Sequence, residues 1–97
     1  MEKINILDIE EKNQEIIKND FFVVKYLYFE AGKGLFTQIE QAMVILQVIE
    51  GKITFVYGKE EKKFMMPQGM ILEFDGRETY SIIAHENSKA LMIISTK

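Results

Sequence analysis

The chain has no cysteine, no tryptophan, one proline and one histidine among its 97 residues. Without cysteine it can form neither a disulfide framework nor a thiolate nucleophile or metal site, a composition compatible with a reducing cytoplasm. The single histidine excludes paired imidazoles. Because His85 falls in the polar segment His85-Glu86-Asn87-Ser88-Lys89, we expect it at the surface and not in a catalytic triad.

A strong charge of either sign is also missing. The 12 basic and 15 acidic residues give a net charge of -3 and are scattered along the chain, so no nucleic-acid partner is expected. The longest apolar stretches, Phe21–Phe29 and Ala42–Ile49, are interrupted by Lys25 and Gln47 and fall short of the roughly 20 residues that cross a bilayer. The first residues lack the apolar core of about 7–15 residues of a secretory signal. We therefore expect a cytoplasmic protein without a membrane partner.

Short runs of β-branched and aromatic residues begin at residue 21 and are separated by turn residues, most of which include glycine. This pattern is typical of an all-β sandwich or barrel. The eight runs that we expect as strands are Phe21–Phe29, Leu35–Gln38, Met43–Ile49, Ile53–Tyr57, Lys62–Met66, Met70–Phe74, Thr79–Ala84 and Ala90–Ser95. Of the connections, Glu50-Gly51-Lys52 is expected to close one hairpin and Gly58-Lys59 to form the tip of the next.

The length of the chain fits one compact domain. We place the barrel in residues 21–97 and an N-terminal extension in residues 1–20. Within the extension, Asp8 is a suitable cap for a short helix that continues to about Ile17.

The segment Ala42–Ile49 is apolar on both faces of the expected strand apart from Gln47. Such a strand needs cover on both sides, one from the interior of the domain and the other from a further layer. We favour a homodimer in which a second subunit supplies that cover. The alternative is that the N-terminal segment folds over the outer face.

The glycines supply a family resemblance. Gly32 and Gly51 frame Gln38, Glu40 and Val44, and in the second half of the chain Gly69 precedes Tyr80 at a matching spacing. With the flanking segments 31–35, 47–51 and 84–91, this frame resembles the small single-domain cupins from Gly32 to about Ile94. The resemblance implies an all-β jelly-roll barrel, the cupin double-stranded β-helix, with about eight antiparallel strands.

The resemblance also places a metal site, and the residues at its positions depart from the family pattern. Cupins of this kind use three histidines and one glutamate, because neutral imidazoles bind first-row divalent ions strongly. The corresponding residues here are Gln38, Glu40, Val44 and Tyr80, of which only Glu40 offers a good anionic oxygen. We therefore predict no metal and no other cofactor.

The same positions predict a mostly apolar pocket with a few polar groups. Its candidate ligand-pocket residues are the four at the former metal positions and others of the same strand parity: Gln38, Glu40, Val44, Tyr80, Phe36, Leu46, Val48 and Ile82. These side chains would either line a cavity or fill the barrel. Glu40 would act as an acid or hydrogen-bond to Tyr80 in a structural role.

We predict a metal-free barrel that binds a small molecule or serves as an accessory or sensing module. One alternative is a metal-independent enzyme with isomerase-like or epimerase-like acid–base chemistry at Glu40 and Tyr80. Another is a purely structural dimer with a filled barrel.

Overall fold

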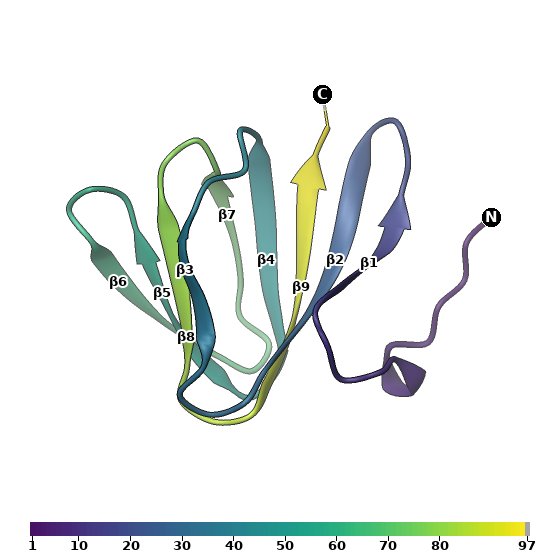
Figure 1. Ribbon diagram of the computed structural model, residues 1–97, viewed down its shortest axis with the longest axis horizontal. Helices are drawn as coiled ribbons and strands as arrows, with labels where there is room; N and C mark the ends of the chain where they lie inside the picture. The colour runs from purple at the N-terminus through teal and green to yellow at the C-terminus, as the bar shows by residue number, and fades with distance from the viewer. Residues whose placement is uncertain (97) are drawn as a thin grey trace.

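The computed structural model describes residues 1–96, and nearly every element in it is a β-strand (Figure 1). Residue 97, the last of the predicted barrel segment, lies outside the described residues. A short 3-10 helix, η1 (Ile6–Asp8), precedes nine strands. These are β1 (Gln14–Lys18), β2 (Phe22–Phe29), β3 (Gly34–Gln38), β4 (Met43–Glu50), β5 (Lys52–Tyr57), β6 (Lys62–Pro67), β7 (Ile71–Asp75), β8 (Tyr80–Ala84) and β9 (Ser88–Ser95). The all-β prediction is confirmed.

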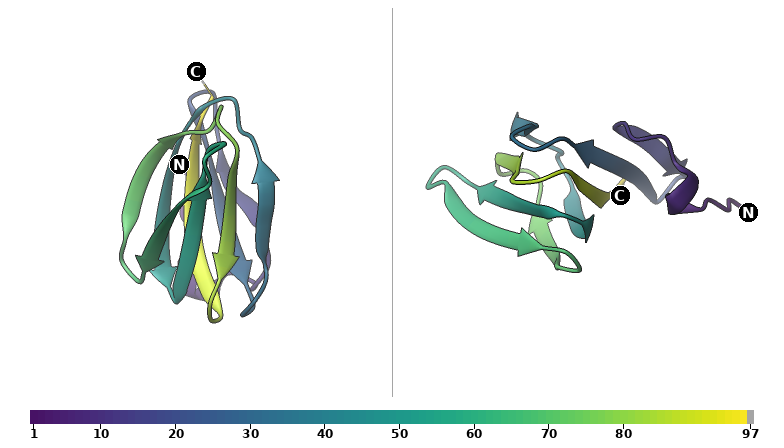
Figure 2. Two further views of the ribbon diagram at one scale, coloured as in Figure 1. Left: turned by 90° about the vertical axis from the view of Figure 1, so that its left-hand side faces the viewer. Right: turned by 90° about the horizontal axis from the view of Figure 1, so that it is seen from below.

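The strands form two antiparallel sheets, one in the order β1-β2-β9-β4-β7 and the other in the order β3-β8-β5-β6. The strands of both sheets run lengthwise in the left panel of Figure 2, and the right panel places the N-terminus at one extreme of the molecule. The only helical element among residues 1–96 has 3 residues, so no helix there approaches the length that spans a bilayer.

The core lies between the sheets because each strand turns alternate side chains toward the other layer. In β9 every second residue from Ser88 to Ile94 is buried, and in β4 the buried residues are Val44, Leu46 and Val48. The four-stranded sheet contributes Ile53, Phe55, Tyr80 and Ile82 to the same cluster. The alternation is therefore a consequence of packing between two layers.

The hairpin predicted at Glu50-Gly51-Lys52 is wrong. β4 pairs with β7 and β9, whereas β5 pairs with β6 and β8 in the other sheet, so this turn carries the chain across the barrel. A glycine turn between two apolar strands fits either connection, and the sequence does not record which neighbours complete each sheet. The hairpin at Gly58-Lys59 is confirmed, since β5 and β6 pair along their whole length.

The helix predicted from Asp8 to Ile17 is also wrong. Only the 3-10 turn of η1 forms, with Asn5 accepting a hydrogen bond from the Leu7 N–H, and Gln14–Lys18 pairs with β2 as β1. The apolar spacing in this segment is too irregular to give a helix a buried face. The free edge of β2 instead offers a row of backbone partners, and the adjacent β-branched pair Ile16 and Ile17 suits a strand.

Candidate functional site

A bulge in β3 determines which of its side chains face the barrel. The pairing between β3 and β8 shifts between Leu35 and Gln38, Thr37 has a φ of 55°, and its N–H donates to the hydroxyl of Ser81 at 2.9 Å. Two residues of β3 therefore oppose one of β8. Leu35 and Gln38 line a pocket at the barrel mouth, while Phe36 is 57% exposed. The placement of Phe36 in the barrel is corrected, because simple strand parity does not hold across a bulge.

Glu40 and Tyr80 are joined by a hydrogen bond at this end of the barrel. The hydroxyl of Tyr80, which is 2% exposed, donates to Oε2 of Glu40 at 2.8 Å and lies 3.6 Å from Sδ of Met92. Burial raises the pKa of Tyr80 far above its ordinary value, and the hydrogen bond to Glu40 and its negative charge act in the same direction. Tyr80 is therefore a protonated hydrogen-bond donor at neutral pH.

The pocket at the barrel mouth has a volume of about 270 Å³. Its polar lining includes Gln38, Glu40, Tyr80 and Lys25. The apolar lining comes from Leu27, Leu35 and Met92. Lys25 was not among the predicted site residues. The sequence does carry a signal for it: Lys25 interrupts an apolar strand two residues before Leu27, and residues two apart in a strand share a face.

The other four predicted pocket residues lie elsewhere. They are fully buried in the core cluster and do not line the mouth pocket: Val44, Leu46, Val48 and Ile82. The interior thus divides into a packed core and an open mouth. The sequence left a cavity and a filled barrel as alternatives. The structure has both, a filled core and a separate pocket at the mouth.

Glu40 is held in place by the turn that follows β7. Its backbone N–H donates to the carbonyl oxygen of Gly76 at 2.8 Å, and the N–H of Gly76 donates to the carbonyl oxygen of Ala42 at 2.7 Å. A Cβ on Gly76 would lie 2.9 Å from Cβ of Glu40 and 2.9 Å from Cγ2 of Val44. Only glycine allows this approach, and sequence reasoning missed it because the two segments are far apart in the chain.

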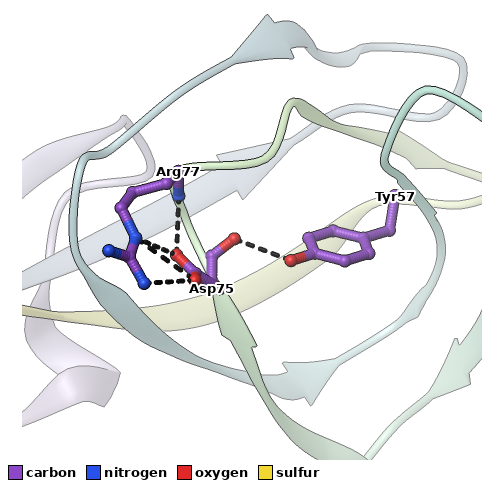
Figure 3. A network of polar contacts seen from close by, with 3 residues as sticks. All are labelled: Tyr57, Asp75 and Arg77. Atoms are coloured by element: carbon purple, nitrogen blue, oxygen red, sulfur yellow. Dashed lines mark hydrogen bonds and ion pairs between the residues drawn. The ribbon is translucent and has the colours of Figure 1, made fainter.

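The flanking residues fix the same turn (Figure 3). The carboxylate of Asp75 accepts hydrogen bonds from the Arg77 backbone N–H and from its guanidinium, the shortest at 2.7 Å. These hydrogen bonds lower the pKa of Asp75 to about 2. The Tyr57 hydroxyl donates to the backbone oxygen of Asp75 at 2.8 Å. Asp75 and Arg77 therefore support the turn and do not line the mouth pocket.

The residues at the former metal positions do not fit a transition-metal site. Val44 has no donor atom, Tyr80 is protonated, and one carboxylate oxygen of Glu40 already accepts the Tyr80 hydrogen bond. Within residues 1–96 there is no group of three or more His, Cys, Asp or Glu residues that could hold an ion. This donor set lacks the imidazoles on which such sites depend.

His85 lies at the surface, as predicted. Its Nε2 contacts the hydroxyl of Thr54, and it does not line the mouth pocket. The histidine is therefore outside the candidate site.

Two antiparallel sheets that enclose a core and a mouth pocket define the jelly-roll class of β-barrels, and comparison with solved structures narrows the class. An RmlC-like cupin protein from Desulfovibrio desulfuricans superposes with a TM-score of 0.86 at 20% identity, over 99% of this chain and 97% of that one. An RmlC-like cupin family protein from Methanocaldococcus jannaschii has a TM-score of 0.82 at 9% identity, over 98% of this chain and 88% of that one. The chain has the cupin double-stranded β-helix fold, and at these identities the likeness shows the fold alone.

The structural neighbours differ in function. The polyketide cyclase RemF from Streptomyces resistomycificus has a TM-score of 0.82 at 11% identity, over 100% of this chain and 80% of that one. No protein-family model matches the sequence, and the comparison with curated proteins finds no match. The fold therefore does not choose between an enzyme and a binding module, and function must be argued from the site.

Proposed function

We propose that this protein is a cytoplasmic cupin barrel that binds a small organic molecule at its mouth without a transition metal, as a binding, accessory or sensing module. The observation that carries the proposal is the pairing of Tyr80 with Glu40 beside a pocket of about 270 Å³. At positions where cupins with a metal centre carry metal-ligating side chains, this chain has a hydrogen bond between Tyr80 and Glu40. Beside it lie apolar walls and a few polar groups, which are the usual components of a small-molecule site.

The purified protein is expected to contain no stoichiometric transition metal, because its donors are too few and too weak. Elemental analysis after dialysis against a mixture of iron, manganese and zinc salts measures this directly. Glu40→Ala removes the one good anionic donor, and Glu86→Ala, at an exposed turn position, is the matched control. The proposal fails if the protein retains about one ion per chain that is lost in Glu40→Ala but not in Glu86→Ala.

Acid–base catalysis is the second candidate, and the short contact between Tyr80 and Glu40 at the pocket favours it. The raised pKa of Tyr80 keeps its hydroxyl protonated, so Tyr80 is a hydrogen-bond donor and not a base, which leaves Glu40 as the only proton acceptor of the pair. A Tyr80→Phe variant separates the two functions, since a binding module would keep its ligand whereas an enzyme would lose turnover.

A homodimer is the partner arrangement that we propose. On the outer face of the five-stranded sheet, Met43 and Ile71 are 43% and 57% exposed, and Ile45 of β4 pairs with Ile93 of β9 on one side and with Glu73 of β7 on the other. The N-terminal alternative accounts for only part of this face. On β2, Tyr26 points outward and is nevertheless fully buried, and Glu11 of the N-terminal segment lies near it. The apolar end of the face at β4 and β7 keeps its exposed side chains, which favours a second subunit as the cover.

Ile45→Lys tests the dimer, because it places a charge at the centre of the proposed interface. We expect sedimentation equilibrium to give the mass of a dimer for the unmodified protein and that of a monomer for the variant. Phe64→Lys, at an exposed position on β6 of the other sheet, is the control and should remain dimeric. A monomeric unmodified protein, or a dimer that survives Ile45→Lys and dissociates in Phe64→Lys, would contradict this interface.

A further inference from the structure

Lys25 is a cation on the inner side of β2. It pairs in register with Met92 of β9, whose side chain belongs to the core, and it lines the mouth pocket. Lys25 is half-buried and forms none of the ion pairs found among residues 1–96. Its cross-strand neighbour on β1, Glu15, is exposed and is not ion-paired with it. Glu15 and Glu40 also line this pocket, but neither forms an ion pair with Lys25 within residues 1–96, which leaves the ammonium group available to an anionic group of a ligand.

Other groups that line the pocket present hydrogen-bond acceptors. Glu40 uses Oε2 for the Tyr80 hydrogen bond, which leaves Oε1 without a partner in the part of the chain that the structure describes. Gln38 uses one amide N–H to donate to the carbonyl oxygen of Phe36 at 3.0 Å, so its amide oxygen and its second N–H are left for a ligand. A ligand that meets these oxygens must donate hydrogen bonds.

The apolar residues of the pocket determine the rest of the ligand. Leu27, Leu35 and Met92 line it together with the polar groups. A volume of about 270 Å³ equals roughly nine water volumes, enough for a molecule of about ten non-hydrogen atoms. The ligand therefore has an apolar body of about the size of one ring.

We infer that the mouth of this barrel takes a small hydroxy acid or amino acid, whose carboxylate binds Lys25, whose hydroxyl or ammonium group donates to Glu40 and Gln38, and whose apolar body packs on Leu27, Leu35 and Met92. This inference rests on the proposed small-molecule function and names the ligand class of the same pocket. It follows from residues of this chain alone, since the decisive cation is Lys25.

Three compounds of nearly equal shape test the ligand class. 4-(Hydroxymethyl)benzoate has the carboxylate, the ring and the hydroxyl, 1,4-benzenedimethanol lacks the carboxylate, and 4-methylbenzoate lacks the hydroxyl. Each is titrated to about 10 mM, above the millimolar affinities expected for molecules of this size, and followed by amide chemical shifts in ¹⁵N-labelled protein. We expect the hydroxy acid to shift the amides of Lys25, Gln38 and Glu40 and to bind roughly tenfold more tightly than either partial analogue.

Lys25→Met keeps the apolar stem and removes the charge, and Lys33→Met at an exposed turn position is its control for net charge. We expect Lys25→Met to abolish the preference for 4-(hydroxymethyl)benzoate over 1,4-benzenedimethanol and Lys33→Met to retain it. Unchanged selectivity in Lys25→Met, or equal binding of the acid and the diol to the unmodified protein, overturns the ligand class and leaves the pocket as a binding site. If none of the three compounds shifts the pocket amides, both the ligand class and the proposed small-molecule function are contradicted.

Discussion

Replacing Gly51 with alanine is expected to destabilise the protein by roughly 2–5 kcal/mol, the largest effect of any single methyl group that we predict. Gly51 has a φ of +92°, in the left-handed region that L-residues rarely adopt. Its added Cβ would also lie 2.6 Å from the backbone oxygen of Asn87 and 2.7 Å from Cα of Ser88. Ser88 is fully buried, and its hydroxyl accepts a hydrogen bond from the Lys52 N–H at 3.1 Å, so the surroundings cannot move aside cheaply.

Gly32→Ala is the matched control for the backbone cost alone. Gly32 belongs to the same glycine frame and has a φ of +83°, but a Cβ there would meet no atom within 4 Å. We expect a loss of only about 1–2 kcal/mol. Urea unfolding of the two variants measures the difference between them. Equal losses would show that the crossing turn at Gly51 is not as tightly packed against the β8–β9 connection as the structure has it.

Removing the hydroxyl of Tyr80 is expected to cost about 1.5–3 kcal/mol at neutral pH, because it leaves the carboxylate of Glu40 without its donor. Tyr57→Phe is the control. The Tyr57 hydroxyl donates to a neutral backbone oxygen of Asp75, so its loss should cost only about 0.5–1.5 kcal/mol. A Tyr80→Phe variant as stable as the unmodified protein would mean that the hydrogen bond to Glu40 does not stabilise the mouth.

The same hydroxyl predicts a loss of stability in alkali. The pKa of Tyr80 is raised above its ordinary value of 10.0, chiefly by burial, so above pH 10 the unfolded chain loses this proton while the folded chain keeps it. The unfolded state then binds fewer protons, and the free energy of unfolding falls as pH rises, by up to about 1.4 kcal/mol per pH unit for this group. Below pH 10 the contribution is fully present.

Tyr80→Phe should therefore show a shallower decline between the neutral range and the alkaline limit of measurement. The pKa values of Tyr26, Tyr28 and Tyr57 are also raised, and these three residues remain in the variant, so the difference between the two unfolding curves isolates Tyr80. Parallel curves above pH 10 would contradict the burial of this hydroxyl in the folded state.

Prediction from the sequence succeeded where local physics decides the outcome. The short runs of β-branched and aromatic residues gave strands, and the glycine frame at Gly32 and Gly51 indicated the barrel that the solved structures share. The same frame directed attention to Gln38, Glu40 and Tyr80, which the structure brings together around one pocket. Side-chain type and spacing were sufficient for these inferences.

Prediction failed where the outcome depends on a distant part of the chain. Phe36 leaves the barrel because a bulge in β3 faces Ser81, and the segment after Asp8 becomes a strand because β2 has a free edge. The turn at Gly51 crosses between sheets, although a hairpin has the same local sequence. None of these partners lies within a few residues of the segment that it controls.

The sequence by itself determined an all-β chain that lacks the imidazoles of a cupin metal site, because composition and spacing are properties of the chain alone. Only the tertiary structure decided how the interior is divided, with Val44, Leu46, Val48 and Ile82 packed in the core and Lys25 beside the Tyr80–Glu40 pair at the mouth. The physical reason is that burial and hydrogen-bond partners depend on which strands of two sheets come to lie side by side, and no single segment carries that information.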